Sequence, residues 1–456
     1  MITLYCARWV VPVSAAPIED GGVAVAGSKI LDVGARPALL EKFPEAAANY
    51  LGEVAILPGL INSHSHLELT AMRGFLEKEE FDFFAWLRKL TVARLEAMTL
   101  DDRYVSAAWG ACESVRAGVT CLADACEDAD ETMKALNDIG LRGIVFQESF
   151  GPDPRLAEDN LSKLKAKVAD LIAHETQLVK VGVSPHAPYT VCGRQLEIIS
   201  KFAQAEELPL MMHAAESAAE EMFMREGRGV FAEALASRGI AWRAPGISTV
   251  QYLKRHGILQ TRPLLAHCIR VDETDLETLK EFEASIAHCP KSNAKLGHGR
   301  APFAAFLDHG IDVGIGSDSV ASNNTCDILE EARFATLMAR SELAANPGLR
   351  VPDSTDAMHA ASWGGARALG LQGQIGELRK GLEADFTAVS LGGTHHLPSY
   401  DPIDTLIFAS SGRDVILTVV AGREVYRDGH VTTIDEERLR ARMKEIATKL
   451  DAMTFA

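Results

Sequence analysis

The segment LPGLINSHSHLELTAMRG, residues 57–74, contains the pattern that decides the fold. A mainly apolar run ends in His64 and His66, and a carboxylate, Glu68, follows two residues later. Residues two apart on an extended chain project from the same face, so both imidazoles can reach one ion. A buried strand that ends in polar residues could produce the same short pattern by chance. The rest of the chain has to decide between these two interpretations.

Seven further apolar runs of similar length follow along the chain, each leading into a helical stretch. They cover residues 119–124, 143–149, 179–186, 209–215, 263–268, 284–290 and 312–319. Together with 57–64 they make eight strand–helix units, which predicts an α/β fold with a parallel (β/α)8 TIM barrel. Short strands that are apolar throughout are typical of parallel sheets covered on both faces.

Polar residues gather at the carboxyl ends of these runs, where barrel enzymes carry their chemistry. A single histidine in such a place would indicate only a half-buried imidazole. So many polar tips on one face are hard to explain by structure alone. The residues concerned are His64, His66, Asp124, Glu148, His186, His213, His267, His288 and Asp318.

The two ends of the chain have a different texture from its middle. Residues 1–58 and the segment after 384 contain short runs rich in β-branched residues, separated by Gly, Asp and Pro. Such runs are typical of a small antiparallel sheet, and only the last twenty residues have a helical pattern. We therefore expect a small β-sandwich domain built from 1–58 and 385–456, and a catalytic barrel domain over 59–384.

Composition limits the partners and the compartment. The 456 residues include 46 basic and 63 acidic side chains, a net charge of −17 that disfavours nucleic acid and anionic membranes. Eight cysteines without CxxC pairs indicate a reducing cytoplasm. The N-terminal stretch is a poor signal peptide and a poor membrane span. We expect a cytoplasmic protein whose partner is a small molecule, and a homodimer is compatible with this composition.

Three later tips complete a candidate metal site with the first two histidines. His213, His267 and Asp318 close the fifth, sixth and eighth runs. Imidazole nitrogens with a carboxylate suit Zn²⁺, with Fe²⁺ or Mn²⁺ as alternatives, and leave a position open for water. The sequence thus predicts one catalytic divalent metal per subunit.

Several motifs in order also indicate a family. PGLINSHSHLEL, SPHAPYT, HAAES, AHC, GSDS and GQIGELRKGLEADFTAV together resemble the amidohydrolase superfamily, in its branch of adenosine and S-adenosylhomocysteine deaminases and chlorohydrolases. The resemblance implies that His64, His66, His213 and Asp318 hold the metal. It also implies that His267 hydrogen-bonds the water or the tetrahedral centre and that Glu216 shuttles protons. Asp318 can take the proton of the water, and Glu216 alternatively is a solvated acid at a helix start.

Superfamily members with two metals use a bridging lysine at the fourth strand tip, and this chain has none there. Lys180 lies six residues before His186, about 20 Å at the rise of a strand. This spacing favours one metal and, with it, deamination.

The motifs HLEL, FAWL and FQESFGP resemble the aminodeoxyfutalosine deaminases of menaquinone biosynthesis more than the S-adenosylhomocysteine group. The implied substrate is 6-amino-6-deoxyfutalosine, an adenine nucleoside with an aryl ketone and a carboxylate. Trp86 would stack on a base or simply pack the first helix. The expected substrate contacts are Glu68, Trp86, Glu148 and His186. The candidate cations for the carboxylate are Arg73, Arg88, Arg94, Arg142 and Arg155.

Other functions stay open at this point. S-adenosylhomocysteine, methylthioadenosine or adenosine is the alternative substrate, and a triazine-type chlorohydrolase or aminohydrolase would share the metal site. A catalytically inactive relative is disfavoured because every predicted metal and proton-transfer residue is present. The insert 225–259 would form either a lid over the barrel mouth or an oligomer contact.

Overall fold

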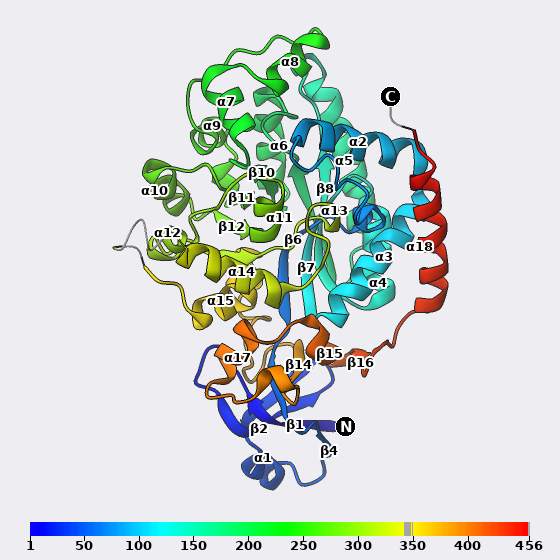
Figure 1. Ribbon diagram of the computed structural model, residues 1–456, viewed down its shortest axis with the longest axis vertical. Helices are drawn as coiled ribbons and strands as arrows, with labels where there is room; N and C mark the ends of the chain where they lie inside the picture. The colour runs from blue at the N-terminus through cyan, green and yellow to red at the C-terminus, as the bar shows by residue number, and fades with distance from the viewer. Residues whose placement is uncertain (342–347, 349, 455–456) are drawn as a thin grey trace.

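The computed structural model describes residues 1–341, 348 and 350–454. Its centre consists of two four-stranded parallel sheets (Figure 1). The first contains β6 (Leu60–Ser65), β7 (Val119–Cys126), β8 (Arg142–Ser149) and β9 (Val179–Pro185). The second contains β10 (Met211–Ala214), β11 (Leu264–His267), β12 (Ser285–His288) and β13 (Val313–Ile315). Each of the eight predicted runs overlaps one of these strands, so the predicted α/β fold with parallel strands is confirmed.

The two parallel sheets meet at both of their edges. An isolated parallel bridge joins Val183 of β9 to Leu210, just before β10, and another joins Ser65 of β6 to Asp318, just after β13. Nearly every residue of the eight strands is buried, as expected for parallel strands covered by helices. All eight carboxyl ends consequently point toward the same end of the molecule, where the predicted site residues lie.

Helices surround these sheets (Figure 1). Most begin at a side-chain cap. Thr99 and Asp102, for example, form a capping box at the start of α3. The helices are α2 (Phe83–Ala97), α3 (Leu100–Arg116), α4 (Ala129–Ile139), α5 (Ala157–Ala173), α6 (Gly193–Ala205), α7 (Ala218–Glu226), α8 (Val230–Ser237), α9 (Thr249–Arg255), α10 (Glu273–Glu281), α11 (Pro290–Lys295), α12 (Phe303–Asp308), α13 (Val320–Asn323), α14 (Ile328–Arg340), α15 (Ser354–Ala361) and α16 (Trp363–Ala368).

Both ends of the chain contribute to a third sheet, at the lower end of Figure 1. It has nine strands in the order β17-β16-β15-β14-β5-β1-β2-β3, with β4 beside β1. The expectation of an antiparallel sheet is only partly met, because β1 pairs in parallel with β4 and β5. The sandwich-domain assignment stays a prediction. The elements are β1 (Ile2–Val10), β2 (Ile18–Ala26), β3 (Lys29–Ala35), α1 (Arg36–Lys42), β4 (Ala47–Tyr50), β5 (Val54–Pro58), β14 (Phe386–Ser390), α17 (Pro402–Phe408), β15 (Val415–Val420), β16 (Arg423–Arg427) and β17 (His430–Val431).

The opening run 57–64 is divided between two sheets. Its first two residues end β5 in the nine-stranded sheet, and β6 of the parallel sheet begins at Leu60. At the junction Arg142 of β8 makes two hydrogen bonds to Asp385, of 2.7 and 3.0 Å, and the backbone N–H of Gly59 donates to the Asp385 carbonyl. A buried bidentate ion pair therefore links the parallel strands to the sheet of the chain ends.

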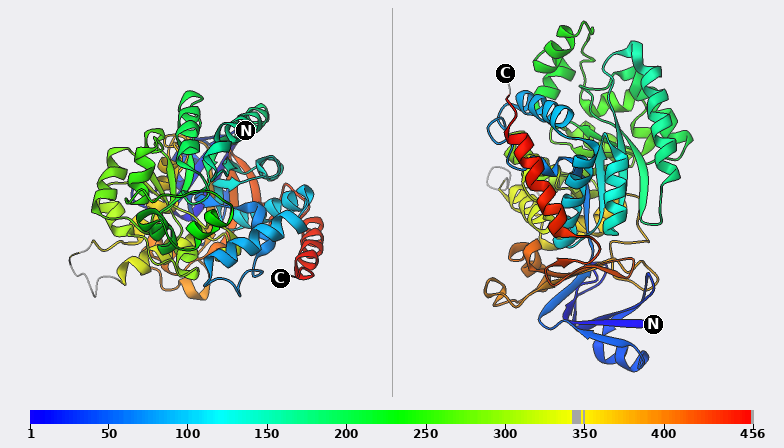
Figure 2. Two further views of the ribbon diagram at one scale, coloured as in Figure 1. Left: turned by 90° about the horizontal axis from the view of Figure 1, so that it is seen from above. Right: turned by 90° about the vertical axis from the view of Figure 1, so that its right-hand side faces the viewer.

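The C-terminal helix leaves that sheet and packs along α3, as the red ribbon in Figure 2 shows. This helix, α18 (Glu436–Asp451), brings Arg442 and Lys449 to the buried Asp102 of α3. Among the described helices, none is long and apolar enough to cross a membrane. All eight cysteines are free thiols.

Candidate active site

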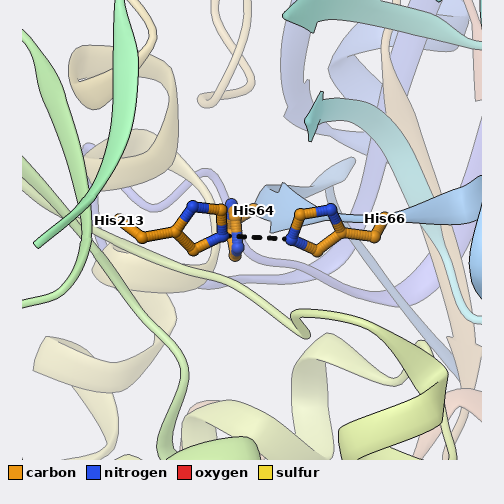
Figure 3. A group of neighbouring side chains, drawn as sticks. All are labelled: His64, His66 and His213. Atoms are coloured by element: carbon orange, nitrogen blue, oxygen red, sulfur yellow. Dashed lines mark hydrogen bonds between the residues drawn. The ribbon is translucent and has the colours of Figure 1, made fainter. Parts of the chain in front are cut away.

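Four of the predicted metal ligands meet at the carboxyl ends of the strands. His64 and His66 come from the end of β6, and His213 comes from β10 (Figure 3). The Nε2 atoms of His66 and His213 are 3.1 Å apart. Asp318 Oδ1, at the tip of β13, is 3.4 Å from His64 Nε2 and 3.6 Å from His66 Nε2. Nitrogen and oxygen atoms from the ends of four strands thus form two overlapping groups of possible ligands that share His64: one with His66 and His213, the other with His267 and Asp318.

Contacts behind the rings hold the imidazoles in this orientation. His213 Nδ1 lies 2.9 Å from the His186 carbonyl, so Nδ1 carries the proton and Nε2 keeps its lone pair. His64 Nδ1 lies 3.2 Å from the sulfur of Met211, again leaving Nε2 toward the centre. Partners of this kind behind a ligand ring are what a metal site requires to hold each histidine in one tautomer.

The donor set fits a divalent ion. Burial lowers the pKa of His64 and of His213, and burial followed by the charge of His64 lowers the pKa of His66 to about 4. The three imidazoles are therefore neutral at pH 7, the form that binds metals. His64 Nε2 is buried and has no hydrogen-bond partner within the described part of the chain. A buried acceptor without a donor, beside two imidazoles and a carboxylate, suits Zn²⁺.

Asp318 is held in its ionised form by its neighbours. Burial raises its pKa, but His64, His267 and His66 outweigh that effect and leave the pKa well below the ordinary value. The hydroxyls of Ser292 and Ser322 donate to Oδ2, which turns Oδ1 toward the imidazoles. The backbone φ of Asp318 is +57°, a conformation that costs energy outside glycine and that occurs at functional sites.

Glu216 and His267 face each other beside the metal ligands. His267 Nε2 is 3.7 Å from Glu216 Oε1, and its Nδ1 is 2.9 Å from the Asn293 side-chain oxygen. The Tyr189 hydroxyl donates to Glu216 Oε2 at 3.5 Å. Glu216 is only 4% exposed, so the alternative of a solvated acid is wrong. Burial raises its pKa to about 7, where a carboxyl group can both take and release a proton.

A cavity of about 580 Å³ opens over this cluster. Its floor contains His66, His213, Glu216, His267 and Asp318, and its walls contain all four predicted substrate contacts. Trp86 is buried and stacks near Phe83, so it both lines the cavity and packs its helix. Helix α2 forms one wall and α8 another, so part of the insert 225–259 lies at the mouth of the site.

The other predicted contacts are polar groups in the cavity wall. Glu68 is buried, accepts a hydrogen bond from Arg94 at 3.3 Å and has a second oxygen without a partner among the described residues. Glu148 lies in a group with His186 and His213 whose polar atoms are all within 4.8 Å of one another. Burial, then the charge of Glu68, raises the pKa of Glu148 to about 8. His186 Nδ1 bonds Thr190.

The predicted cations separate into two groups. Arg88 and Arg94 line the cavity, whereas Arg73, Arg142 and Arg155 pair with acids elsewhere, as does Lys180 at the exposed start of β9. Sequence reasoning missed Tyr189, Asn293, Arg238 and His298, all at or beside the site. Of these four residues, only Tyr189 lies in one of the motifs that indicate the family, SPHAPYT, although the motif did not identify it as a site residue.

Known proteins match this chain over nearly its whole length. The model of the amidohydrolase family matches residues 55–425. The chain belongs to this family. A 5-methylthioadenosine/S-adenosylhomocysteine deaminase of Pelotomaculum thermopropionicum is 31% identical, over 95% of this chain and 94% of the relative.

Solved structures share the fold of this amidohydrolase. An adenosine deaminase from Xanthomonas campestris with bound zinc superimposes with a TM-score of 0.86 at 24% identity, covering 99% of both chains. Helicobacter pylori aminofutalosine deaminase, in complex with methylthio-coformycin, has a TM-score of 0.77 at 21% identity, covering 93% of this chain and all of that one.

Proposed function

We propose that this amidohydrolase is a hydrolytic deaminase of adenine nucleosides that uses one divalent metal ion, zinc first. One observation carries the proposal. His64, His66 and His213 form one group of possible ligands, and Asp318 lies within 3.6 Å of His64 and His66. The proton-transfer pair Glu216 and His267 lies beside them on the floor of the same cavity. The curated relatives at 30–31% identity, all named as nucleoside deaminases, support this substrate class.

The residues divide the work of replacing an aromatic amine by water. His64, His66, His213 and Asp318 would hold the ion, which supplies Lewis-acid activation of water at neutral pH. Asp318 Oδ1 accepts the proton of the attacking water. Glu216, with its pKa near 7, carries a proton to the ring nitrogen. The amino group takes the proton that Asp318 accepted and leaves as ammonia. His267 stabilises the oxygen that develops at the tetrahedral carbon.

Within this class the proposal places 6-amino-6-deoxyfutalosine, and hence menaquinone biosynthesis, first. Glu68, Trp86 and Glu148, from the motifs that resemble aminodeoxyfutalosine deaminases, all line the cavity, as does His186 of the SPHAPYT motif. The outer walls are aromatic and aliphatic side chains of α2 and α8, which suit an aryl substituent on the nucleoside: Phe83, Phe84, Leu87, Phe231 and Leu235. Methylthioadenosine, S-adenosylhomocysteine or adenosine is the alternative, supported by the names of the curated relatives.

The architecture belongs to the same proposal. The two bridges between the parallel sheets support one closed TIM barrel over residues 59–384 that carries the site. Residues 1–58 and 385–456 would form the second, smaller domain. The proposed compartment is a reducing cytoplasm, which the eight free thiols support.

The experiment is a comparison of kcat/KM for ammonia release by the zinc-loaded protein. The panel contains 6-amino-6-deoxyfutalosine, methylthioadenosine, S-adenosylhomocysteine, adenosine and a chloro- or aminotriazine. We expect the first compound to have the highest value. A higher kcat/KM for methylthioadenosine or S-adenosylhomocysteine would make that compound the substrate in place of 6-amino-6-deoxyfutalosine. Turnover of the triazine alone would overturn the nucleoside assignment.

A further inference from the structure

His298 is a buried imidazole in the loop after α11, between two exposed glycines. The loop follows α11, and its neighbours Gly297 and Gly299 are exposed with φ of +69° and +110°. Both values are in the region that L side chains rarely adopt, so the two glycines permit the chain to turn His298 inward. His298 itself is 6% exposed. The Gly-His-Gly sequence thus places one polar ring under the wall of the cavity.

The buried face of this ring points at the proposed proton shuttle. His298 Nε2 lies 3.6 Å from Glu216 Oε1 and, among the described residues, has no hydrogen-bond partner. On its other side the ring meets the edge of Phe83, with centroids 4.5 Å apart. Phe83 belongs to α2 and lines the cavity, so a ligand in the cavity contacts the residue that packs on His298.

Helix α11, which precedes this loop, orients the other imidazole at Glu216. The backbone N–H of His298 donates to the Asn293 carbonyl at 2.9 Å, and the side chain of Asn293 bonds His267 Nδ1. Two imidazoles therefore approach Glu216 Oε1, at 3.6 and 3.7 Å, from positions that α11 and the loop after it define. Oε2 has the Tyr189 hydroxyl instead.

A purely packing role for His298 does not account for these contacts. An apolar side chain would fill the space under Phe83 without a nitrogen atom in need of a partner. A buried polar atom without a hydrogen-bond partner is destabilising. His298 Nε2 is buried, has no partner among the described residues and points at a buried carboxylate. This arrangement indicates a hydrogen bond that forms in another state of the site.

We propose that His298 is a positioning residue that donates its Nε2–H to Glu216 Oε1 when substrate occupies the cavity. The proposal rests on the proton-shuttle role proposed for Glu216. Catalytic hydrogen bonds are often long in ligand-free structures and tighten in the substrate complex, so a separation of 3.6 Å is compatible with this role. The bond would fix the carboxylate in one orientation between Tyr189 and His267.

The protonation state of the ring agrees with this role. Burial, followed by the charge of His267, lowers the pKa of His298 to about 4, so the ring is neutral at pH 7. A neutral imidazole has one N–H and one lone pair. The Nε2–H tautomer gives Glu216 a hydrogen-bond donor that carries no net charge.

The test compares two pairs of variants, all loaded with zinc. His298→Gln places an amide nitrogen near the position of Nε2, whereas His298→Asn is too short to do so. His298→Leu fills the space without a donor, and His309→Leu, on a partly exposed histidine that pairs with Glu273, is its matched control. Metal content and Tm are measured for each variant.

We expect kcat to fall about 10- to 100-fold in the Asn and Leu variants, the scale of a misplaced catalytic group. KM and metal content should change little in these variants, and His309→Leu should keep a kcat close to that of the wild type. The Gln variant should recover most of kcat. In a Glu216→Gln background, His298→Leu should cause no further loss, because the two residues act as one unit. If the Leu variant fails to fold, the Asn and Gln pair gives the same comparison.

The outcomes separate this proposal from the function it rests on. The assay uses whichever compound the wild type turns over fastest among the adenine nucleosides and triazines. Turnover of triazines alone would remove the nucleoside assignment but would leave the comparison of the His298 variants valid. Wild-type kcat in both the Asn and Leu variants would overturn the role of His298, as would equal losses in the Asn and Gln variants. Near-normal kcat in Glu216→Gln would overturn both the proton-shuttle role of Glu216 and the positioning role of His298.

Discussion

Glu216 shows how its surroundings give an ordinary carboxylate a catalytic property. Its side chain lies among Tyr189, His267 and His298 rather than in solvent. Burial disfavours the charged form and brings the pKa to about 7. A group that is half protonated near neutral pH can take a proton and pass it on without a large energy penalty, which a solvated glutamate cannot do as well.

Replacing Glu216 by Gln tests this role at the residue scale. The amide keeps the size of the side chain but cannot carry a proton, so we expect kcat to fall about 10²- to 10⁴-fold. Metal content should be unchanged, because Glu216 is outside the proposed ligand set. Zinc analysis and steady-state kinetics measure both quantities, with the exposed Glu221→Gln as the matched control. A kcat near that of the wild type would disprove the mechanism.

Glu148 predicts a dependence of stability on pH. Its pKa rises from the ordinary 4.5 to about 8 in the folded protein. The folded state therefore keeps a proton that the unfolded chain releases between these values, so this residue's contribution to stability is lost as pH rises toward 8. The neutral Glu148→Gln should show a smaller fall of Tm from pH 5 to pH 9 than the wild type. The exposed Glu158→Gln is the control, and parallel Tm profiles for all three proteins would contradict the expectation.

Residues at strand tips were predictable from the sequence, whereas residues on loops were not. His64, His66 and His213 each end a short apolar run, so the chain itself marks their place at one edge of a parallel sheet. Asn293 lies in the short helix α11 and His298 in the loop that follows it, and nothing in their local pattern indicates which strand tip they approach. Their role depends on tertiary contacts with His267 and Glu216.

At the scale of elements, a buried charge network attaches helix α2 to the strand ends. Arg94 of α2 is 7% exposed at its side chain and forms ion pairs with Glu68, Glu127 and Asp128. Arg103 of α3 joins the same network at Asp128. One side chain of α2 therefore anchors the wall of the cavity to a residue that is expected to contact substrate.

Removing the charge of Arg94 should loosen this wall. Arg94→Met keeps much of the length of the side chain but leaves three carboxylates without their common partner. We expect the free energy of unfolding in urea to fall by about 3–5 kcal/mol, with a raised KM for nucleosides. Arg225→Met removes an exposed ion pair with Glu221 and should cost about 0–1 kcal/mol. Equal costs for the two variants would show that the Arg94 network does not hold α2.

The division of residues 57–64 between two sheets falls where the sequence placed the boundary, between residues 58 and 59, but the strand that pairs with β5 could not be seen in the sequence. The run is continuous in its apolar character, and Pro58 and Gly59 are compatible with a turn as well as with a strand that changes partner. Pairing decides the outcome, because residues 54–58 of β5 pair with β14, more than 300 residues away in the chain. The place of α8 in the cavity wall could not be predicted either, because the amphipathic pattern of a helix does not identify the surface that the helix covers.

At the scale of the whole molecule, the ion pair between Arg142 and Asp385 joins the parallel strands to the sheet of the chain ends. Asp385 is 1% exposed at its side chain and also accepts the backbone N–H of Ala421. The charge of Asp385 outweighs burial and raises the pKa of Arg142. The two regions are therefore expected to unfold together.

Asp385→Asn should weaken this connection because it leaves Arg142 buried beside a neutral partner. We expect a loss of about 3–5 kcal/mol in the free energy of unfolding. Asp312→Asn, which removes the half-exposed partner of Arg367, should cost no more than about 1 kcal/mol. Urea titration followed by circular dichroism measures both. A loss for Asp385→Asn no larger than for Asp312→Asn would contradict a structural role for the buried pair.

The proposed zinc-dependent deamination is tested most directly by measuring ammonia release from an adenine nucleoside as zinc is titrated into metal-free protein. We expect activity to rise with added zinc and to level off at one equivalent per chain, and His64→Ala to show neither tight binding nor turnover. Absence of ammonia from every adenine nucleoside at any zinc content, or full activity in metal-free protein, would contradict the account.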